Sequence, residues 1–186
     1  MQIEKTKLDG VVIVTPERYV DDRGFFSECW SRARLSEAGV YLDFVQVNHS
    51  LSVATGTIRG LHFQVPPHAQ AKLVRCGRGA LFDVAVDLRR GSPTYGHWVG
   101  VELSFENGRQ LLVPAGFAHG FVTREPDTEA VYKCSDYYSP ECDRALRWDS
   151  CGIDWGLDGM PVLSPRDAAA PALAEIESPF TYEASS

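Results

Sequence analysis

Short apolar stretches recur along most of the chain, and residues that favour turns separate them. The stretches are rich in Val, Leu, Phe and Tyr, which favour strands, and Gly, Pro, Asn and Asp lie between them. Close spacing of many short strands is typical of an all-β sandwich or barrel, not of units in which strands alternate with helices. The predicted strands span residues 11–14, 24–30, 43–53, 57–65, 70–77, 79–88, 96–104, 109–113, 118–124 and 128–138.

Two segments have the features of short helices. Residues 31–38 begin with Ser31, a residue type favoured at the N-cap, and Gly39 follows directly. A second helical segment is expected within residues 166–176, interrupted at Pro171 because proline cannot continue a helix. The pattern therefore predicts an all-β protein with a few short peripheral helices.

Several of the predicted strands have two unlike faces. On residues 43–53, short polar side chains such as Gln46 and Asn48 alternate with mainly apolar ones, and residues 128–138 alternate in a similar way. Either the polar face contacts solvent, or it lines a ligand-binding cavity inside a barrel. The pattern alone leaves both interpretations open.

Residues 57–76 concentrate positive charge among apolar neighbours. Arg59, His62 and Lys72 lie on two predicted strands joined by a turn at Pro66. Such a cluster is costly to enclose unless an anion is paired with it. We therefore expect an anionic substrate here, and we expect His62 to move a proton, because histidine titrates near neutral pH.

Gly60 lies between Arg59 and His62, which strict alternation would place on opposite faces of the strand. A glycine inside a strand often marks a bulge that turns its neighbours. We predict a bulge or sharp bend at Gly60 that brings both side chains into one pocket.

Composition and charge narrow the class of protein. Hydrophobic residues make up 44% of the 186 residues, which is enough for a sizeable core in one domain. A net charge of −7 argues against general nucleic-acid binding, which requires a basic surface. The apolar run at residues 11–14 is too short for a signal-peptide core or a membrane span, so we expect a cytoplasmic protein without a membrane partner.

The five cysteines are odd in number and include no C-x-x-C pair. This usage is typical of reduced thiols in the core and not of a disulfide framework or a zinc site.

Residues 108–119, GRQLLVPAGFAH, match the second motif of the cupin superfamily, G-x5-P-x-G-x2-H. The first cupin motif requires H-x-H, but this chain has His62-Phe63-Gln64 at the corresponding place. The cation of Lys72 nearby would repel a metal ion. Two scattered histidines do not make a site for a first-row metal, and we predict that none is bound.

Over roughly residues 10–172, the chain resembles the dTDP-4-dehydrorhamnose 3,5-epimerase family. The resemblance rests on ordered blocks, namely DDRGFF, QVNHS, RGLHFQ, AQAKLVRC, DVAVDLRRGSPTYG, PAGFAHGF, YKCSDYYSP and LSPRDAAAP. It implies a metal-free, cofactor-free, cupin-like jelly roll that acts on a dTDP-sugar and is typically a homodimer. We expect one jelly-roll domain over residues 1–186, with residues 1–10 and 173–186 as peripheral ends.

The family reaction inverts C3 and C5 of a 4-keto sugar. Both carbons lie next to the C4 carbonyl, so the enzyme needs a base, an acid on the opposite face and a group that stabilises the enolate. By resemblance, His62 is the base and Asp167 holds its imidazole. Tyr132 is the acid, and Lys72 stabilises the enolate oxygen.

The resemblance also implies a set of substrate-binding residues. Arginines suit a diphosphate because their planar fork binds two oxygens at once. The implied contacts are Arg23, Arg59 and Arg166 to the diphosphate or sugar, Tyr19 or Tyr138 stacked on the base, Glu28 and Gln46 at the base edge, Asn48 and His119 beside the sugar, and Asp143. This chain departs from the usual family pattern by having Val47 in place of Asp, Arg166 in place of Lys and Asp143 in place of Glu.

Three other functions remain open at this point. An epimerase that inverts only C5 or only C3 would keep the base and lose or move the acid, and Tyr132 favours inversion at both carbons. A metal-dependent cupin enzyme would contain stoichiometric metal. A binding module without activity would have lost His62, Asp167 and Tyr132, which this chain retains.

Overall fold

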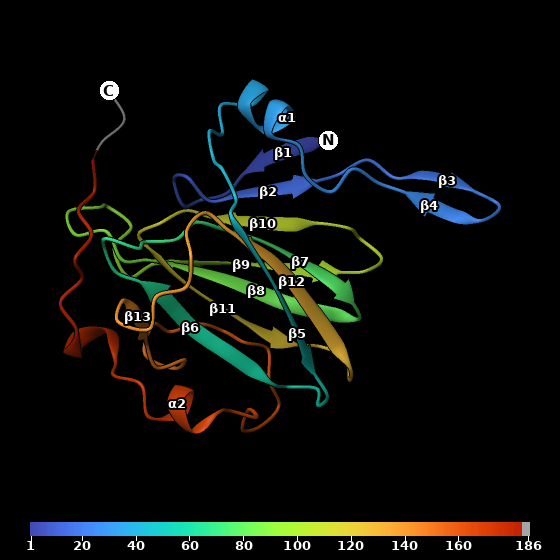
Figure 1. Ribbon diagram of the computed structural model, residues 1–186. Helices are drawn as coiled ribbons and strands as arrows, with labels where there is room; N and C mark the ends of the chain where they lie inside the picture. The colour runs from blue at the N-terminus through green and yellow to red at the C-terminus, as the bar shows by residue number, and fades with distance from the viewer. Residues whose placement is uncertain (184–186) are drawn as a thin grey trace.

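Two antiparallel β-sheets face each other in the computed structural model, which describes residues 1–183 (Figure 1). One sheet consists, in spatial order, of β1 (Gln2–Lys5), β2 (Val12–Thr15), β10 (Gln110–Val113), β7 (Lys72–Arg78), β12 (Thr128–Cys134) and β5 (Gln46–Ser52). The other consists of β13 (Asp143–Ala145), β6 (Ile58–Gln64), β11 (Phe117–Thr123), β8 (Ala80–Asp87) and β9 (Trp98–Ser104). The chain crosses repeatedly between them, as in an antiparallel sandwich.

Smaller elements lie around the two sheets. The hairpin of β3 (Tyr19–Asp21) and β4 (Gly24–Phe26) projects from the body, and α1 (Arg32–Glu37) lies near β1 and β2 (Figure 1). Near the C-terminus are α2 (Pro165–Ala168) and the 3₁₀ turn η1 (Leu173–Glu175). None of the helices within residues 1–183 has the length and apolar composition needed to cross a membrane.

Each predicted strand overlaps an observed one, but short edge strands were missed. The strands β1, β3 and β13, of 4, 3 and 3 residues, had no clear alternation. The predicted strand 128–138 ends at Cys134, where the chain leaves the sheet. Both predicted helical segments are present, and Ser31 precedes α1 with an extended backbone, although its side chain makes no capping hydrogen bond.

The chain ends are joined to the body. Residues 1–10, expected to be peripheral, include the edge strand β1 and the fully buried Leu8. At the other end, Ser178 is buried, and Thr181 forms a bridge with Arg90. The last three residues of the segment 173–186 lie outside the described residues.

The five-stranded sheet is covered on both faces. Leu81 and Ala85 of β8 pack into the cluster between the sheets, whereas Val84 and Val86 pack against a second cluster with Trp155. Figure 1 shows the C-terminal segment, in orange and red, crossing beside β6 and β11. Since both faces are buried, this sheet is a rigid support for the side chains that it presents inward.

The interior beside β5 is polar. Gln46, Asn48 and Ser50 are half-buried, whereas Val47 and Leu51 are 59% and 49% exposed. The ordinary arrangement of apolar residues inside and polar residues outside is thus reversed on this strand. Of the two interpretations left open by the sequence, the polar cavity is the one that the structure supports.

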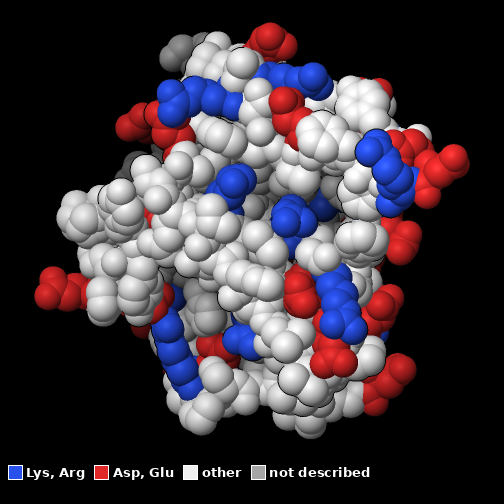
Figure 2. Space-filling view, turned by 45° about the vertical axis from the view of Figure 1, so that its right-hand side comes forward, with Lys and Arg blue, Asp and Glu red and all other residues white. Residues whose placement is uncertain are grey.

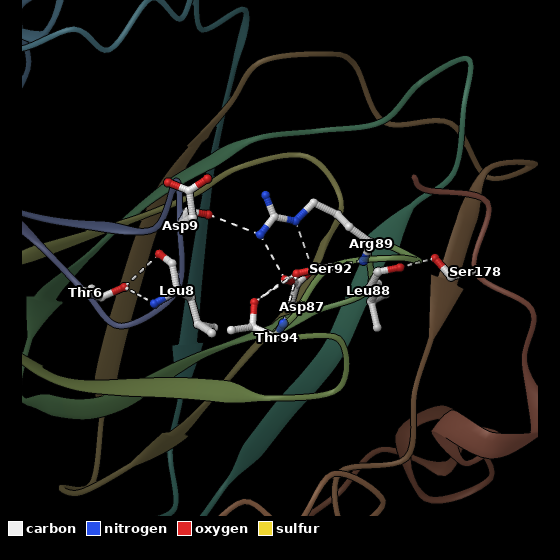
Figure 3. A network of polar contacts seen from close by, with 9 residues as sticks. All are labelled: Thr6, Leu8, Asp9, Asp87, Leu88, Arg89, Ser92, Thr94 and Ser178. Atoms are coloured by element: carbon white, nitrogen blue, oxygen red, sulfur yellow. Dashed lines mark hydrogen bonds and ion pairs between the residues drawn. The ribbon is translucent and has the colours of Figure 1, made fainter. Parts of the chain in front are cut away.

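A second polar cluster holds the loop that follows β8 (Figure 3). The buried carboxylate of Asp87 accepts hydrogen bonds from Arg89 Nε and Nη2, both at 2.9 Å, and from the hydroxyls of Ser92 and Thr94, both at 2.7 Å. Arg89 also donates to the carbonyl of Asp9 at 3.3 Å. These bonds lower the pKa of Asp87, although its burial alone would raise it.

Candidate active site

A bulge in β6 sets the geometry of the site. Arg59 pairs with Phe121 of β11, and His62 pairs with His119. The two residues Gly60 and Leu61 between these pairs on β6 therefore face the single residue Gly120 on β11. Gly60 provides the extra residue with a φ of +129°, and a Cβ there would meet the backbone of the facing strand at 2.5 Å. Arg59 and His62 consequently line the same cavity, of about 380 Å³. The bulge predicted at Gly60 is confirmed.

His62 and Asp167 form a hydrogen-bonded pair at the wall of this cavity. The distance from His62 Nε2 to Asp167 Oδ1 is 2.6 Å, and the other carboxylate oxygen accepts from Gly60 N at 3.4 Å. Ser164 caps α2 by accepting a hydrogen bond from Asp167 N at 3.1 Å, which fixes the backbone of the aspartate. Burial alone would raise the pKa of Asp167, but the hydrogen bond and charge of His62 lower it. Because Nε2 is occupied, Nδ1 is the ring nitrogen of His62 left for a substrate.

Lys72 and Tyr132 come from the opposite sheet. Lys72 pairs with Cys134 across β7 and β12, and Tyr132 lies two residues before that cysteine, so both side chains share one face. Both line the cavity with His62. Burial lowers the pKa of the Lys72 ammonium and raises that of the Tyr132 phenol. The tyrosine therefore keeps its proton at neutral pH, and it faces the histidine across the cavity.

A second histidine–carboxylate pair lies beside the first. His119 is the cross-strand partner of His62, and its Nε2 lies 2.8 Å from Asp83 Oδ1. Asp83 is fully buried, and its other oxygen has no hydrogen-bond partner among residues 1–183. Burial raises the pKa of Asp83, against the opposing charges of His119 and Lys72.

Asp83 was not among the site residues predicted from the sequence. A signal was present, because Asp83 lies between Phe82 and Val84 in the middle of a strand whose other acidic residue, Asp87, stands at its end. An acidic residue within such a strand is seldom buried unless it is paired.

A smaller cavity of about 190 Å³ adjoins the first and shares His62, Lys72, Tyr132 and Arg166 with it. Four further residues that the sequence predicted as substrate contacts also line it, namely Gln46, Asn48, Tyr138 and Asp143.

Asp143 is the centre of a charged group in this second cavity. Arg166 Nη1 lies 2.8 Å from Asp143 Oδ2, and the hydroxyl of Tyr138 donates to the same oxygen at 3.2 Å. The charge of Asp143 raises the pKa of Tyr138. The contacts of Gln46 differ from those expected, because its amide accepts from Tyr138 N at 3.0 Å and donates to Asn48 at 3.0 Å, both within the protein.

Three predicted substrate contacts do not lie at either cavity of this chain. Tyr19 and Arg23 belong to the projecting hairpin, where Tyr19 donates to Glu17 and Arg23 pairs with Asp21. Glu28 follows the hairpin and pairs with Arg34 at 3.0 Å. The remaining predicted residues are brought to the cavities, namely Gln46, Asn48, Arg59, His62, Lys72, His119, Tyr132, Tyr138, Asp143, Arg166 and Asp167.

Gln64 stands where the cupin motif would place its second histidine. Its amide is held entirely by the protein backbone, since it donates to the carbonyls of His68 and Tyr137 and accepts from Ser139 N. Within residues 1–183, no group of three or more His, Cys, Asp or Glu side chains is arranged to hold a metal ion. A metal-free site stays a prediction that metal analysis can test.

Comparison with known proteins identifies the family. A sequence model described as dTDP-4-dehydrorhamnose 3,5-epimerase matches residues 5–175, which is most of the chain. The chain belongs to this family. The dTDP-4-dehydrorhamnose 3,5-epimerase of Sinorhizobium fredii is 50% identical to it over 188 residues, which cover 98% of this chain and 94% of the relative. The enzyme of that name from Salmonella typhimurium is 49% identical over 176 residues, covering 93% of this chain and 96% of the relative.

Solved structures of dTDP-4-dehydrorhamnose 3,5-epimerase family members share the fold. A dTDP-6-deoxy-D-glucose-3,5-epimerase from Legionella pneumophila, in complex with dTDP-4-keto-L-rhamnose, has 45% identity and a TM-score of 0.93. The similarity covers 98% of this chain and 99% of that one. The family resemblance and the all-β, cupin-like jelly-roll fold predicted from the sequence are both confirmed.

Proposed function

We propose that this chain is an isomerase that inverts C3 and C5 of dTDP-4-dehydro-6-deoxy-D-glucose to give dTDP-4-dehydro-L-rhamnose. Each inverted carbon is adjacent to the C4 carbonyl, so loss of its proton leaves an enolate, and return of a proton from the other face inverts the centre. One observation supports this reaction above all: a carboxylate-paired histidine and a protonated tyrosine line the same cavity from opposite sheets.

The roles follow from the positions of the groups. His62 takes the proton through Nδ1, while Asp167 holds the ring and stabilises the imidazolium that forms. Tyr132 gives a proton from the opposite wall. Lys72 stabilises the negative charge that develops on the C4 oxygen, and the low-dielectric surroundings that lower its pKa also strengthen that interaction.

The charge distribution favours an anionic substrate. The chain has a net charge of −7, yet Arg59, Lys72 and Arg166 line the larger cavity. Figure 2 shows a few basic side chains recessed in hollows near the middle of one face, whereas other basic side chains and most acidic ones lie toward its rim. Recessed cations raise the local concentration of a negatively charged ligand. Arg166 lines both cavities, so a diphosphate bound to it would direct the nucleoside toward Tyr138.

We also propose that the protein acts as a homodimer. The projecting hairpin exposes Val20 and Phe26 at 78% and 71%, and edge strand β5 exposes Val47 at 59%. Exposed apolar residues on a hairpin and on a sheet edge favour burial against another chain.

In this assembly the hairpin would bring Tyr19, Arg23 and Glu28 to the cavity of a second copy. The variant Phe26→Asp should then weaken both self-association, measured by sedimentation, and dTDP affinity. A variant that remains dimeric and binds dTDP normally would contradict this assembly.

Cytoplasmic location, without a cofactor, membrane or nucleic-acid partner, completes the proposal. All five cysteines are free thiols, which agrees with a reducing compartment.

The decisive experiment is incubation with dTDP-4-keto-6-deoxyglucose in deuterated water, with C3 and C5 followed by NMR. Deuterium should enter at both carbons, with net inversion, and the His62→Ala variant should incorporate it at neither. Exchange at a single carbon would favour the single-site epimerase. Stoichiometric iron, manganese or zinc in the purified protein would overturn the metal-free mechanism.

A further inference from the structure

Residues 135–139, which we call the strap, follow β12 and contain Tyr138. Side chains from elsewhere in the chain bind the backbone of the strap at four successive residues. Gln70 donates to the carbonyl of Asp136 at 2.7 Å, and Gln64 donates to that of Tyr137 at 3.1 Å. Two further glutamine oxygens accept from the amides of Tyr138, at 3.0 Å, and of Ser139, at 2.7 Å. A loop backbone held in this way is fixed before any ligand arrives.

Among the side chains of residues 1–183, Gln64 makes two of these four bonds, whereas Gln70 and Gln46 make one each. Gln64 is 4% exposed. It donates a hydrogen bond to Tyr137 O and accepts one from Ser139 N, so it holds the backbone of the strap on both sides of Tyr138. A further bond, to the carbonyl of His68 at 2.6 Å, completes its two donors. Both N–H groups of Gln64 are therefore donated to the backbone, and although Gln64 lines the smaller cavity, its amide nitrogen has no donor left for a substrate.

Gln46 gives the strap a second support. It accepts from Tyr138 N, whereas its amide nitrogen donates to Asn48 at 3.0 Å. The side chain of Tyr138 is thereby directed to the smaller cavity, where its hydroxyl donates to Asp143, the partner of Arg166. The hydrogen-bonded path therefore runs from Gln64 through the strap to the cation expected to hold the diphosphate.

We propose that Gln64 is a positioning residue that fixes Tyr138 at the nucleotide end of the site, with Gln46 as its second support. Gln64 acts on nucleotide binding and leaves proton transfer at His62 largely unaffected. This inference rests on the proposed function and adds a determinant of nucleotide affinity. A purely structural role for Gln64 would lower stability without a selective loss of affinity.

The test compares Gln64→Met with Gln110→Met. Methionine matches glutamine in length but supplies no donor. Gln110 is 2% exposed and donates to the carbonyl of Cys29 at 2.7 Å, away from both cavities, so it controls for the loss of a buried side-chain hydrogen bond.

For Gln64→Met, we expect KM and the Kd for dTDP to rise about tenfold, with kcat changed less than about threefold. Gln110→Met should lower Tm while KM and Kd stay within about twofold of wild type. Hydrogen exchange at the amides of Tyr138 and Ser139 should accelerate only in Gln64→Met.

A double-mutant cycle with Tyr138→Ala shows whether the effect passes through Tyr138. In that background, Gln64→Met should raise the Kd for dTDP by less than about twofold. A full tenfold rise there, or an unchanged Kd in the single variant, would overturn the proposal. If Gln64→Met does not fold, Gln46→Met takes its place, with an expected rise of about threefold that also disappears beside Tyr138→Ala. Absence of deuterium exchange in the wild type would refute the epimerase function instead, since the dTDP titrations do not depend on turnover.

Discussion

Replacing Asp167 with asparagine removes one negative charge from beside His62 and keeps the size of the side chain. The carboxylate is 4% exposed, accepts from His62 Nε2 at 2.6 Å and accepts from Gly60 N at 3.4 Å. An asparagine amide cannot serve both contacts. If its oxygen faces His62, its NH₂ group meets the N–H of Gly60. If its NH₂ group faces His62, Nε2 must accept, and the ring proton moves to Nδ1, where the base is needed.

The size of the effect follows from these bonds. A hydrogen bond to a charged group contributes about 1.5–3 kcal/mol, and its loss from the imidazolium alone slows proton abstraction roughly 10- to 100-fold. The wrong tautomer adds to this, and for histidine–aspartate pairs in other enzymes the total reaches about 10⁴-fold. We expect deuterium incorporation at C3 and C5 to slow about 10²- to 10⁴-fold in Asp167→Asn. The Kd for dTDP should stay within about threefold, because Asp167 faces the base and not the diphosphate.

The assay is NMR-detected exchange in deuterated water at fixed enzyme and substrate, with dTDP titration and Tm on the same preparations. Asp149→Asn is the control, because Asp149 is exposed and pairs with Arg147 at 2.6 Å outside both cavities. Exchange in Asp167→Asn within about fivefold of wild type, with the fold intact, would refute the assignment of His62 and Asp167 as the base pair.

Three further changes test other parts of the structure. Gly60→Ala places a Cβ 2.5 Å from the Cα of Gly120 at a φ of +129°, so it should lower the free energy of unfolding, measured in urea, by at least about 2 kcal/mol. The control Gly159→Ala places its Cβ in open space and should not lower it. Equal effects of the two substitutions would contradict the close approach of the strands. Asp87→Asn should lower stability by about 3 kcal/mol at pH 7. The pKa of Asp87 is lowered in the folded protein, so its contribution to stability is present above its ordinary pKa and is lost as pH falls through the folded value; the effect of the substitution should therefore shrink as pH is lowered below the ordinary pKa. A pH-independent loss in urea unfolding would show that charge is not the cause. Lys72→Met should slow deuterium exchange by about 10²- to 10³-fold with dTDP affinity nearly unchanged, and a loss confined to affinity would place Lys72 at the diphosphate instead.

The features that depended on local sequence were predictable. Alternation located the strands, and the glycine between Arg59 and His62 indicated the bulge that aims both at one cavity. The pairing of His62 with Asp167 spans 105 residues, and no local pattern contains it. Only the family resemblance connected the two positions.

Other features depend on contacts that the local sequence does not contain. The strands β1, β3 and β13 are too short to establish an alternation, and their pairing depends on the sheet that they join. The role expected for Gln46 at the base edge stays a prediction, but its hydrogen bond to the backbone of Tyr138 was not predictable, because it depends on the loop packed against Gln46. Arg23 lies on a projecting hairpin, so its contribution to a site depends on assembly and not on the fold of one chain.

The close approach of β6 and β11 has a consequence for how the family can vary. A Cβ on Gly60 would meet Gly120 at 2.5 Å, and a Cβ on Gly120 would meet the carbonyl of Arg59 at 2.9 Å. Neither position can gain a side chain while the other strand stays in place, so a substitution at either glycine must displace the facing strand. In a scan of all substitutions, both glycines should be as intolerant as His62, but through loss of protein abundance. His62 variants should accumulate normally and lack activity. Protein abundance and activity measured together would therefore separate a catalytic residue such as His62 from Gly60 and Gly120, which determine how closely β6 and β11 pack.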